Sequence, residues 1–162
     1  MDMQGEIKKT YGEKLRVRVC GICIKADTIL LVKHKHLGNS GTLWAPPGGG
    51  MEYGEDAKTA LIREFKEETG LIINVKDFLF VHEYLDEPLH GIELFFSVEI
   101  TGGELQLGFD PEFEHTAQLL SDVSFQNLKT LQLADNESLH YVLQNTKDLE
   151  TLINQKGYFK FH

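Results

Sequence analysis

The chain has 162 residues, a length that favours one domain with a sizeable core. Its formal net charge is −9, and no block of five or six like charges occurs, which argues against general binding to nucleic-acid polymers or anionic membranes. No apolar run reaches transmembrane length and residues 1–14 lack a signal-type apolar region, so we expect a cytoplasmic protein. We expect a single domain over residues 1–162, with a core at about 13–135 and a helical extension and tail at about 136–162.

The first predicted elements are two strands, at 15–24 and 28–33, joined by a hairpin signal at 25–27. The first strand contains Cys20 and Cys23, whose odd separation points the two thiols to opposite faces. A zinc ribbon needs a second cysteine pair, which this sequence lacks. We therefore interpret both as buried structural thiols, and keep a redox motif as the alternative.

The middle of the chain predicts a loop and then a helix. A polar, basic loop at 33–41 and a short apolar segment at 42–45 lead into the tight Pro-Pro-Gly-Gly-Gly loop at 46–50. Residues 56–69 lack Gly and Pro and are rich in helix formers, and Gly70 follows where a left-handed C-terminal residue is expected. On this helix Glu64, Glu67 and Glu68 are three and four positions apart, so they share one face.

The second half predicts two strands at 71–84 and 91–100, a turn at 101–103, a short returning strand at 104–107 and a last strand at 118–125. Helices are expected at 126–134 and 136–145, from their periodic Leu residues. The aromatic tail at 156–162 either packs back or pairs with another subunit. A mixed set of strands around one acidic helix, closed by C-terminal helices, predicts an α/β sandwich.

The shared face of the acidic helix predicts a metal site. Three neighbouring carboxylates repel one another, and the same-face residue one turn earlier is the uncharged Ala60. A hard divalent cation relieves this repulsion, and oxygen ligands suit Mg²⁺ or Mn²⁺. The alternative is a solvated acidic stripe.

The segment GGMEYGEDAKTALIREFKEETGL, residues 49–71, resembles the Nudix box in all of its fixed letters. The resemblance implies an α/β/α sandwich with a mixed sheet, and an enzyme that hydrolyses a phosphoanhydride bond between a nucleoside diphosphate and another group. It also implies that Glu64, Glu67, Glu68 and the Gly48 carbonyl bind the metal, and that Arg63 orients the glutamates. Glu55 is expected to support the start of the helix or to hold the metal ligands in place without binding the metal itself.

The resemblance leaves the water-activating base open. We expect Glu64 or Glu67 to act with metal-bound water, and keep Glu83, Glu112 and Glu114 as alternatives. Each of these three is otherwise an ordinary solvated loop charge.

Substrate identity is weakly encoded. A nucleoside triphosphate or a nucleotide sugar is expected; the marker positions of ADP-ribose and dinucleoside polyphosphate hydrolases hold Asp86 and Glu87 here, so neither group is assigned. The candidate phosphate-binding residues are Arg16, Arg18, Lys33 and Lys35, and Trp44 is a candidate for stacking on a base. The alternatives are a non-catalytic nucleotide sensor, an ADP-ribose or dinucleoside polyphosphate pyrophosphatase, and an interaction protein with an acidic helix. The protein is expected to be a monomer or a homodimer.

Overall fold

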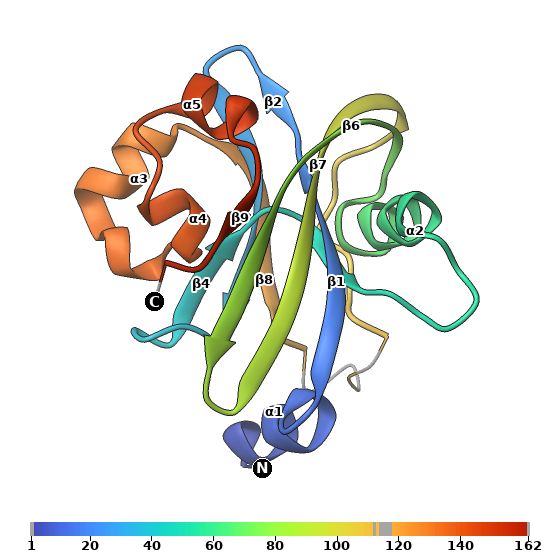
Figure 1. The fold of residues 1–162 in the computed structure, drawn as a ribbon, viewed down its shortest axis with the longest axis vertical. Helices are drawn as coiled ribbons and strands as arrows, with labels where there is room; N and C mark the ends of the chain where they lie inside the picture. Colours follow the sequence, from blue (N-terminus) through green and yellow to red (C-terminus); the bar gives the residue numbers. More distant parts are fainter. Residues whose placement is uncertain (1, 112, 114–117, 162) are drawn as a thin grey trace.

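The computed structural model describes residues 2–111, 113 and 118–161, and its two β-sheets have helices on both sides (Figure 1). The larger sheet has the order β5-β1-β7-β6-β9. Its β1–β7 and β6–β9 pairs are parallel and its β1–β5 and β6–β7 pairs are antiparallel, so the predicted mixed sheet is confirmed. The bounds of these strands are β1 Leu15–Ile22, β5 Gly48–Gly50, β6 Leu71–Asp86, β7 Leu89–Gly103 and β9 Tyr158–Phe159.

The second sheet places β3 between β4 and β8. It consists of β2 (Ile24–Lys25), β3 (Thr28–Lys35), β4 (Thr42–Ala45) and β8 (Leu120–Gln126). The loop predicted from residue 33 therefore begins later than expected, because β3 continues to Lys35 through its pairing with β4.

Helix α2 (Ala57–Thr69) is the predicted acidic helix and lies on one side of the sheets (Figure 1). The Asp56 side chain accepts a hydrogen bond from the Thr59 N–H at 2.8 Å, which caps the start of the helix. Gly70 ends it with a φ of 73°, the left-handed conformation that the sequence predicts. Leu61 and Phe65 are fully buried in a cluster that also contains Val19 and other strand residues. Burial of this apolar side turns the acidic side of the helix away from the core.

The C-terminal helices cover the opposite side. They are α3 (Leu128–Asp135), the 3₁₀ helix η2 (Asn136–Ser138), α4 (Tyr141–Gln144) and α5 (Leu149–Asn154). The single helix expected at 136–145 is wrong, because the chain is extended at Leu139 and the His140 N–H donates to the Trp44 carbonyl oxygen at 2.9 Å. This break directs the His140 side chain into the interior, where it is 3 % exposed.

The strand expected at 104–107 is also wrong. Instead, this segment crosses the end of α2, where the Gln106 N–H donates to the Thr69 carbonyl and the Gly108 N–H donates to the Glu68 carbonyl, both at 2.9 Å. The last carbonyls of a helix lack partners within the helix, and this segment satisfies two of them.

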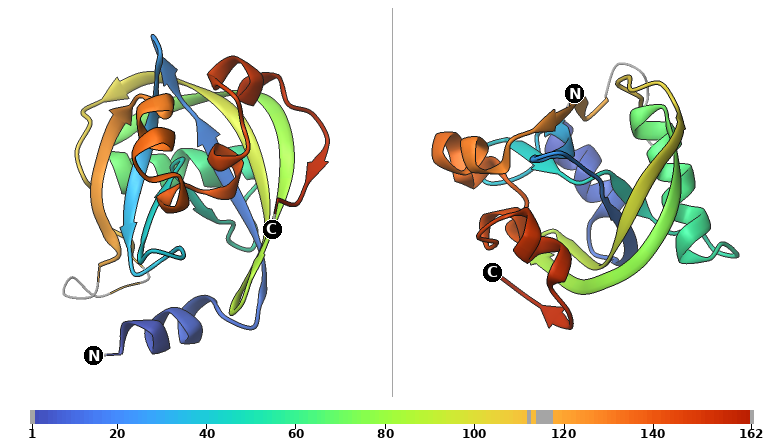
Figure 2. Two further views of the ribbon diagram at one scale, coloured as in Figure 1. Left: turned by 90° about the vertical axis from the view of Figure 1, so that its left-hand side faces the viewer. Right: turned by 90° about the horizontal axis from the view of Figure 1, so that it is seen from above.

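The two ends of the chain both add structure that the sequence analysis left open. Residues before Leu15 form helix α1 (Met3–Tyr11), at the end of the molecule where the β6–β7 hairpin turns (Figures 1 and 2). The C-terminal tail packs back onto its own chain, because β9 extends the larger sheet beside β6. Among the described residues, no helix has the length and hydropathy needed to cross a membrane.

Candidate active site

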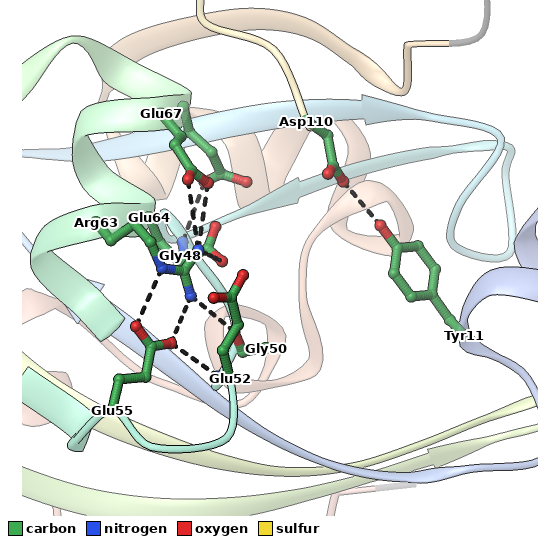
Figure 3. A network of polar contacts seen from close by, with 10 residues as sticks. Tyr11, Gly48, Gly50, Glu52, Glu55, Arg63, Glu64, Glu67 and Asp110 are labelled. Carbon is green, nitrogen blue, oxygen red and sulfur yellow. Dashed lines mark hydrogen bonds and ion pairs between the residues drawn. The ribbon is translucent and has the colours of Figure 1, made fainter. Parts of the chain in front are cut away.

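Arg63, on the polar face of α2, organises the acidic residues around it (Figure 3). Its Nε donates to Glu55 Oε2 at 3.1 Å and its Nη2 donates to Glu55 Oε1 at 2.6 Å. Nη1 reaches Glu64 at 2.9 Å and Glu67 at 3.4 Å, and Nη2 also donates to the Gly50 carbonyl oxygen at 3.2 Å. One guanidinium therefore links the Gly-rich loop, the segment before the helix and two of the box glutamates.

Glu64, Glu67 and Glu68, called the box glutamates below, line a cleft together with the Gly-rich loop at 48–50. The Gly48 N–H donates to Glu68 Oε2 at 3.1 Å, so the loop and the helix are joined directly. A side chain at Gly49 would displace the Glu64 carboxylate, because its Cβ would lie 2.4 Å from the Glu64 carboxyl carbon. The absence of side chains at 48–50 thus lets the backbone approach the carboxylates closely.

The electrostatics of this cluster suit a hard cation. Burial raises the pKa of Glu64 to about 7 and raises the pKa of Glu68 well above its usual range, with the neighbouring Glu64 charge adding to the effect at Glu68. Burial also raises the pKa of Glu67. Ionised carboxylates in such surroundings are costly unless a positive charge compensates them. The carboxylates offer only oxygen atoms as ligands, which Mg²⁺ and Mn²⁺ prefer, so the residues present fit such an ion.

Arg16 and Arg18, both on β1, line the same cleft. Arg18 Nη1 donates to Glu93 Oε2 at 3.0 Å, and the Arg16 guanidinium carbon lies 4.2 Å from the centre of the Tyr11 ring. Because alternate residues of a strand share a face, the next residue in this series, Cys20, also lines the cleft. Cys23 belongs to a different buried cluster from Cys20, in line with the prediction of opposite faces, and both are free thiols.

Lys33, Lys35 and Trp44 do not line the cleft, although the sequence analysis grouped them with the two arginines. Strand alternation explains this placement. On β3 it is His34, between the two lysines, that lines the cleft, and its Nε2 lies 4.0 Å from Glu68 Oε1. On β4, Leu43 and Ala45 line it, whereas Trp44 packs in the core with the Lys33 ammonium 5.6 Å from its ring centre. Burial lowers the pKa of His34 to about 4, so it is neutral at pH 7.

Glu93, which also lines the cleft, is fully buried and was not singled out by the sequence analysis. Its Oε1 accepts from His82 Nδ1 at 2.9 Å and from His140 Nε2 at 2.8 Å. Although burial opposes ionisation, the two histidines and Arg18 hold the pKa of Glu93 well below its usual range.

His82, Glu93 and His140 have potential ligand atoms within 4.8 Å of one another, which raises the question of a metal ion there. The positions of the histidine protons favour a hydrogen-bonded triad instead. The Val142 N–H donates to His140 Nδ1 at 3.1 Å, so a neutral His140 carries its proton on Nε2 and donates it to Glu93.

The alternative candidates for the base fall into two groups. Glu83 lies outside the cleft lining, and its carboxylate accepts from His90 Nε2 at 2.8 Å and from the Tyr158 hydroxyl. Glu112 and Glu114 lie outside the described residues. An acidic residue that the sequence analysis did not consider, Asp110, lines the cleft and accepts a hydrogen bond from the Tyr11 hydroxyl at 2.7 Å (Figure 3).

The chain is similar to known proteins. The family model described as the NUDIX domain matches residues 14–144. An ADP-ribose pyrophosphatase of Methanocaldococcus jannaschii is 44% identical over 112 residues, which cover 64% of this chain and 66% of that protein. The 8-oxo-dGDP phosphatase NUDT18 of Mus musculus is 31% identical over 112 residues, covering 66% of this chain and 33% of that protein. The chain therefore spans less than two thirds of the length of either relative.

The fold is also similar to that of solved structures. The crystal structure of an ADP-ribose pyrophosphatase from Streptococcus suis 89-1591 matches with a TM-score of 0.60 at 21% sequence identity, covering 89% of this chain and 98% of that one. At this identity the likeness concerns the fold alone.

Proposed function

The chain belongs to the Nudix hydrolase family, and from this premise we propose that it hydrolyses a phosphoanhydride bond in a derivative of a nucleoside diphosphate. The observation that carries the proposal is the convergence of Glu64, Glu67 and Glu68 on one cleft, beside a Gly-rich loop and together with Arg16 and Arg18. Carboxylates and arginines that line one cleft suit a substrate with phosphate groups that binds together with a metal ion.

In this proposal the three box glutamates and the Gly48 carbonyl hold Mg²⁺, with Mn²⁺ as the alternative. The ion, when bound, neutralises charge on the phosphates and activates water. Glu64 or Glu67 takes the proton from the attacking water, and Arg63 keeps both carboxylates in position through its hydrogen bonds. Among Arg63's partners, Glu55 is the supporting residue, because it sits before the helix and accepts two hydrogen bonds.

Arg16 and Arg18 are the proposed phosphate-binding residues, and Lys33, Lys35 and Trp44 leave the proposed set because they lie outside the cleft lining.

For the substrate, we propose ADP-ribose as the first to test, since the relative that is 44% identical is named an ADP-ribose pyrophosphatase. A nucleoside triphosphate and a nucleotide sugar remain the alternatives. The name of the mouse relative adds 8-oxo-dGDP to the compounds worth testing. A cytoplasmic location and a monomeric or homodimeric state remain predictions.

A turnover screen tests the proposal. Purified protein is incubated with Mg²⁺ and, separately, with ADP-ribose, nucleotide sugars, nucleoside triphosphates, 8-oxo-dGDP and dinucleoside polyphosphates, and products are separated by ion-exchange chromatography. We expect Mg²⁺-dependent cleavage of at least one compound. Glu67→Gln and Glu68→Gln should each lower turnover about 100-fold or more, because an electrostatic ligand at a charged transition state is lost.

Glu83→Gln is the matched control, since it removes a carboxylate outside the cleft lining and should leave turnover within about twofold, the usual range of a surface substitution. Tight nucleotide binding without product from any of these compounds would favour the sensor instead.

A further inference from the structure

Helix α1 precedes the region that the family model matches, which begins at residue 14, yet one of its residues lines the cleft. That residue is Tyr11, at the last position of the helix. The helix therefore contributes to the site a side chain that no part of the matched region supplies.

The Tyr11 hydroxyl donates to Asp110 Oδ2 at 2.7 Å, across 99 residues of sequence (Figure 3). The backbone at Asp110 is fixed as well, because its N–H donates to the Gln118 side-chain oxygen at 2.6 Å and its carbonyl accepts from the Gln118 amide at 2.9 Å. Asp110 lines the same cleft as Glu67 and Glu68, and its negative charge acts on both of them. The hydroxyl thus orients a further acidic side chain of the cleft, beside the box glutamates.

The ring of Tyr11 has a second partner. The Arg16 guanidinium carbon lies 4.2 Å from the ring centre, well within the range of a cation–π contact. Arg16 also passes close to the Gly-rich loop, since its Nη2 would lie 2.6 Å from a Cβ at Gly50. The ring therefore fixes the direction of a cation that also lines the cleft.

Tyr11 is itself held firmly. It is 8 % exposed and packs in a buried cluster with Ile7, Phe113 and Leu119, with its ring centre 5.5 Å from that of Phe113. The Glu13 N–H donates to the Pro88 carbonyl at 3.0 Å, which ties the link after the helix to the β6–β7 turn. A side chain anchored in this way can hold both partners in fixed positions.

We propose that Tyr11 is a positioning residue of the active site, which orients Asp110 toward the box glutamates through its hydroxyl and Arg16 toward substrate phosphate through its ring. The proposal rests on the function proposed above. It assigns the hydroxyl to the catalytic step and the ring to substrate binding, so two substitutions separate the two contributions.

Steady-state kinetics with the substrate found in the screen provides the test. Tyr11→Phe removes only the hydroxyl and should lower kcat about tenfold with little change in KM, because a hydrogen bond to a charged group is lost. Tyr11→Leu also removes the ring and should in addition raise KM about threefold, the size expected for one partly exposed cation–π contact. Tyr158→Phe is the matched control, since the Tyr158 hydroxyl also donates to a carboxylate, that of Glu83, outside the cleft lining.

A double-mutant cycle with Asp110→Asn distinguishes positioning from a general structural role. In the Asp110→Asn background, Tyr11→Phe should cause no further loss of kcat, since the two groups act as one unit. Melting curves identify an assay temperature at which every variant is folded. Wild-type kcat in Tyr11→Phe, or additive losses in the double mutant, would overturn the proposal. A wild-type protein that cleaves no compound in the screen would instead overturn the proposed function.

Discussion

Arg63 and Glu55 form a bidentate ion pair, in which Nε and Nη2 of the arginine donate to the two carboxylate oxygens at 3.1 and 2.6 Å. This pairing leaves Nη1 to contact Glu64 and Glu67. Glu55 lies before the first residue of α2, and its Oε1 also accepts from the Glu52 N–H at 2.7 Å. The direction of the guanidinium is therefore set from outside the helix that carries it.

The first prediction concerns this ion pair. Glu55→Gln removes the charge and one of the two acceptors, so Arg63 should lose its fixed direction and the box glutamates their alignment. We expect kcat to fall about tenfold, the lower end of the range for residues that orient metal ligands. KM for Mg²⁺ should rise, while the melting temperature without metal changes little. Steady-state assays over a Mg²⁺ titration measure both constants.

Glu83→Gln serves as the control for this experiment, because the Glu83 carboxylate is also hydrogen-bonded but lies outside the cleft lining. Equal kcat values and equal Mg²⁺ dependence in the two variants would show that Glu55 does not act through Arg63.

The second prediction concerns stabilisation by metal. A cation that binds only the folded protein at a hundredfold excess over its dissociation constant adds about 2.7 kcal/mol to the free energy of unfolding. For a domain of this size the melting temperature should rise by roughly several degrees. Glu68→Gln should melt slightly higher than the wild type without metal, because Glu68 is only 6 % exposed and burial disfavours its charge. The variant should also show a smaller rise with Mg²⁺.

Differential scanning fluorimetry with EDTA and then with Mg²⁺ measures both effects. An undiminished Mg²⁺ shift in Glu68→Gln would exclude this residue from the metal site.

The acidic helix illustrates what the sequence predicts well. The helix formers at 56–69 and the glycine at position 70 are local signals, and α2 (Ala57–Thr69) lies within the range that they indicate, with Asp56 as its cap. Positions three and four apart share a face, so the spacing alone predicts that Glu64, Glu67 and Glu68 lie on one side of the helix, the side that lines the cleft.

The substrate side of the cleft illustrates what the sequence cannot fix. Arg16 and Arg18 alternate on β1, so they lie on the same face of that strand, and both line the cleft. The sequence does not show which face of β3 or β4 is turned toward the same cleft. Lys33, Lys35 and Trp44 consequently face elsewhere. Glu93 and Asp110 reach the site through contacts with residues 75 and 99 positions away, and no local pattern encodes such distances.

The third prediction concerns the thiols. Burial raises the pKa of Cys23 to about 11 and that of Cys20 well above its usual range, so neither forms the reactive thiolate at neutral pH. The two also lie in different buried clusters. Mild oxidation with diamide should therefore leave turnover unchanged in the wild type, as in the Cys20→Ala, Cys23→Ala double variant. A loss of activity in the oxidised wild type that the double variant escapes would support the redox motif.

The last prediction concerns the buried charge of Glu93. Glu93→Gln preserves the shape of the side chain but leaves Arg18 without its anionic partner and weakens the hydrogen bonds from His82 and His140. Breaking a buried ion pair usually costs about 3–5 kcal/mol of unfolding free energy, and we expect the lower end because the Arg18 side chain is 31 % exposed.

The pH dependence identifies the charge as the cause. The pKa of Glu93 in the folded protein lies well below its ordinary value of 4.5, so its ionisation contributes stability that is complete above pH 4.5 and disappears as the pH falls through the folded-state pKa. Urea unfolding should therefore show the full difference between wild type and Glu93→Gln at pH 5–8, and a shrinking difference below pH 4.5. His34 titrates in both proteins, so its contribution cancels in this comparison. A difference that stays constant down to pH 3 would assign the effect to packing rather than to the charge.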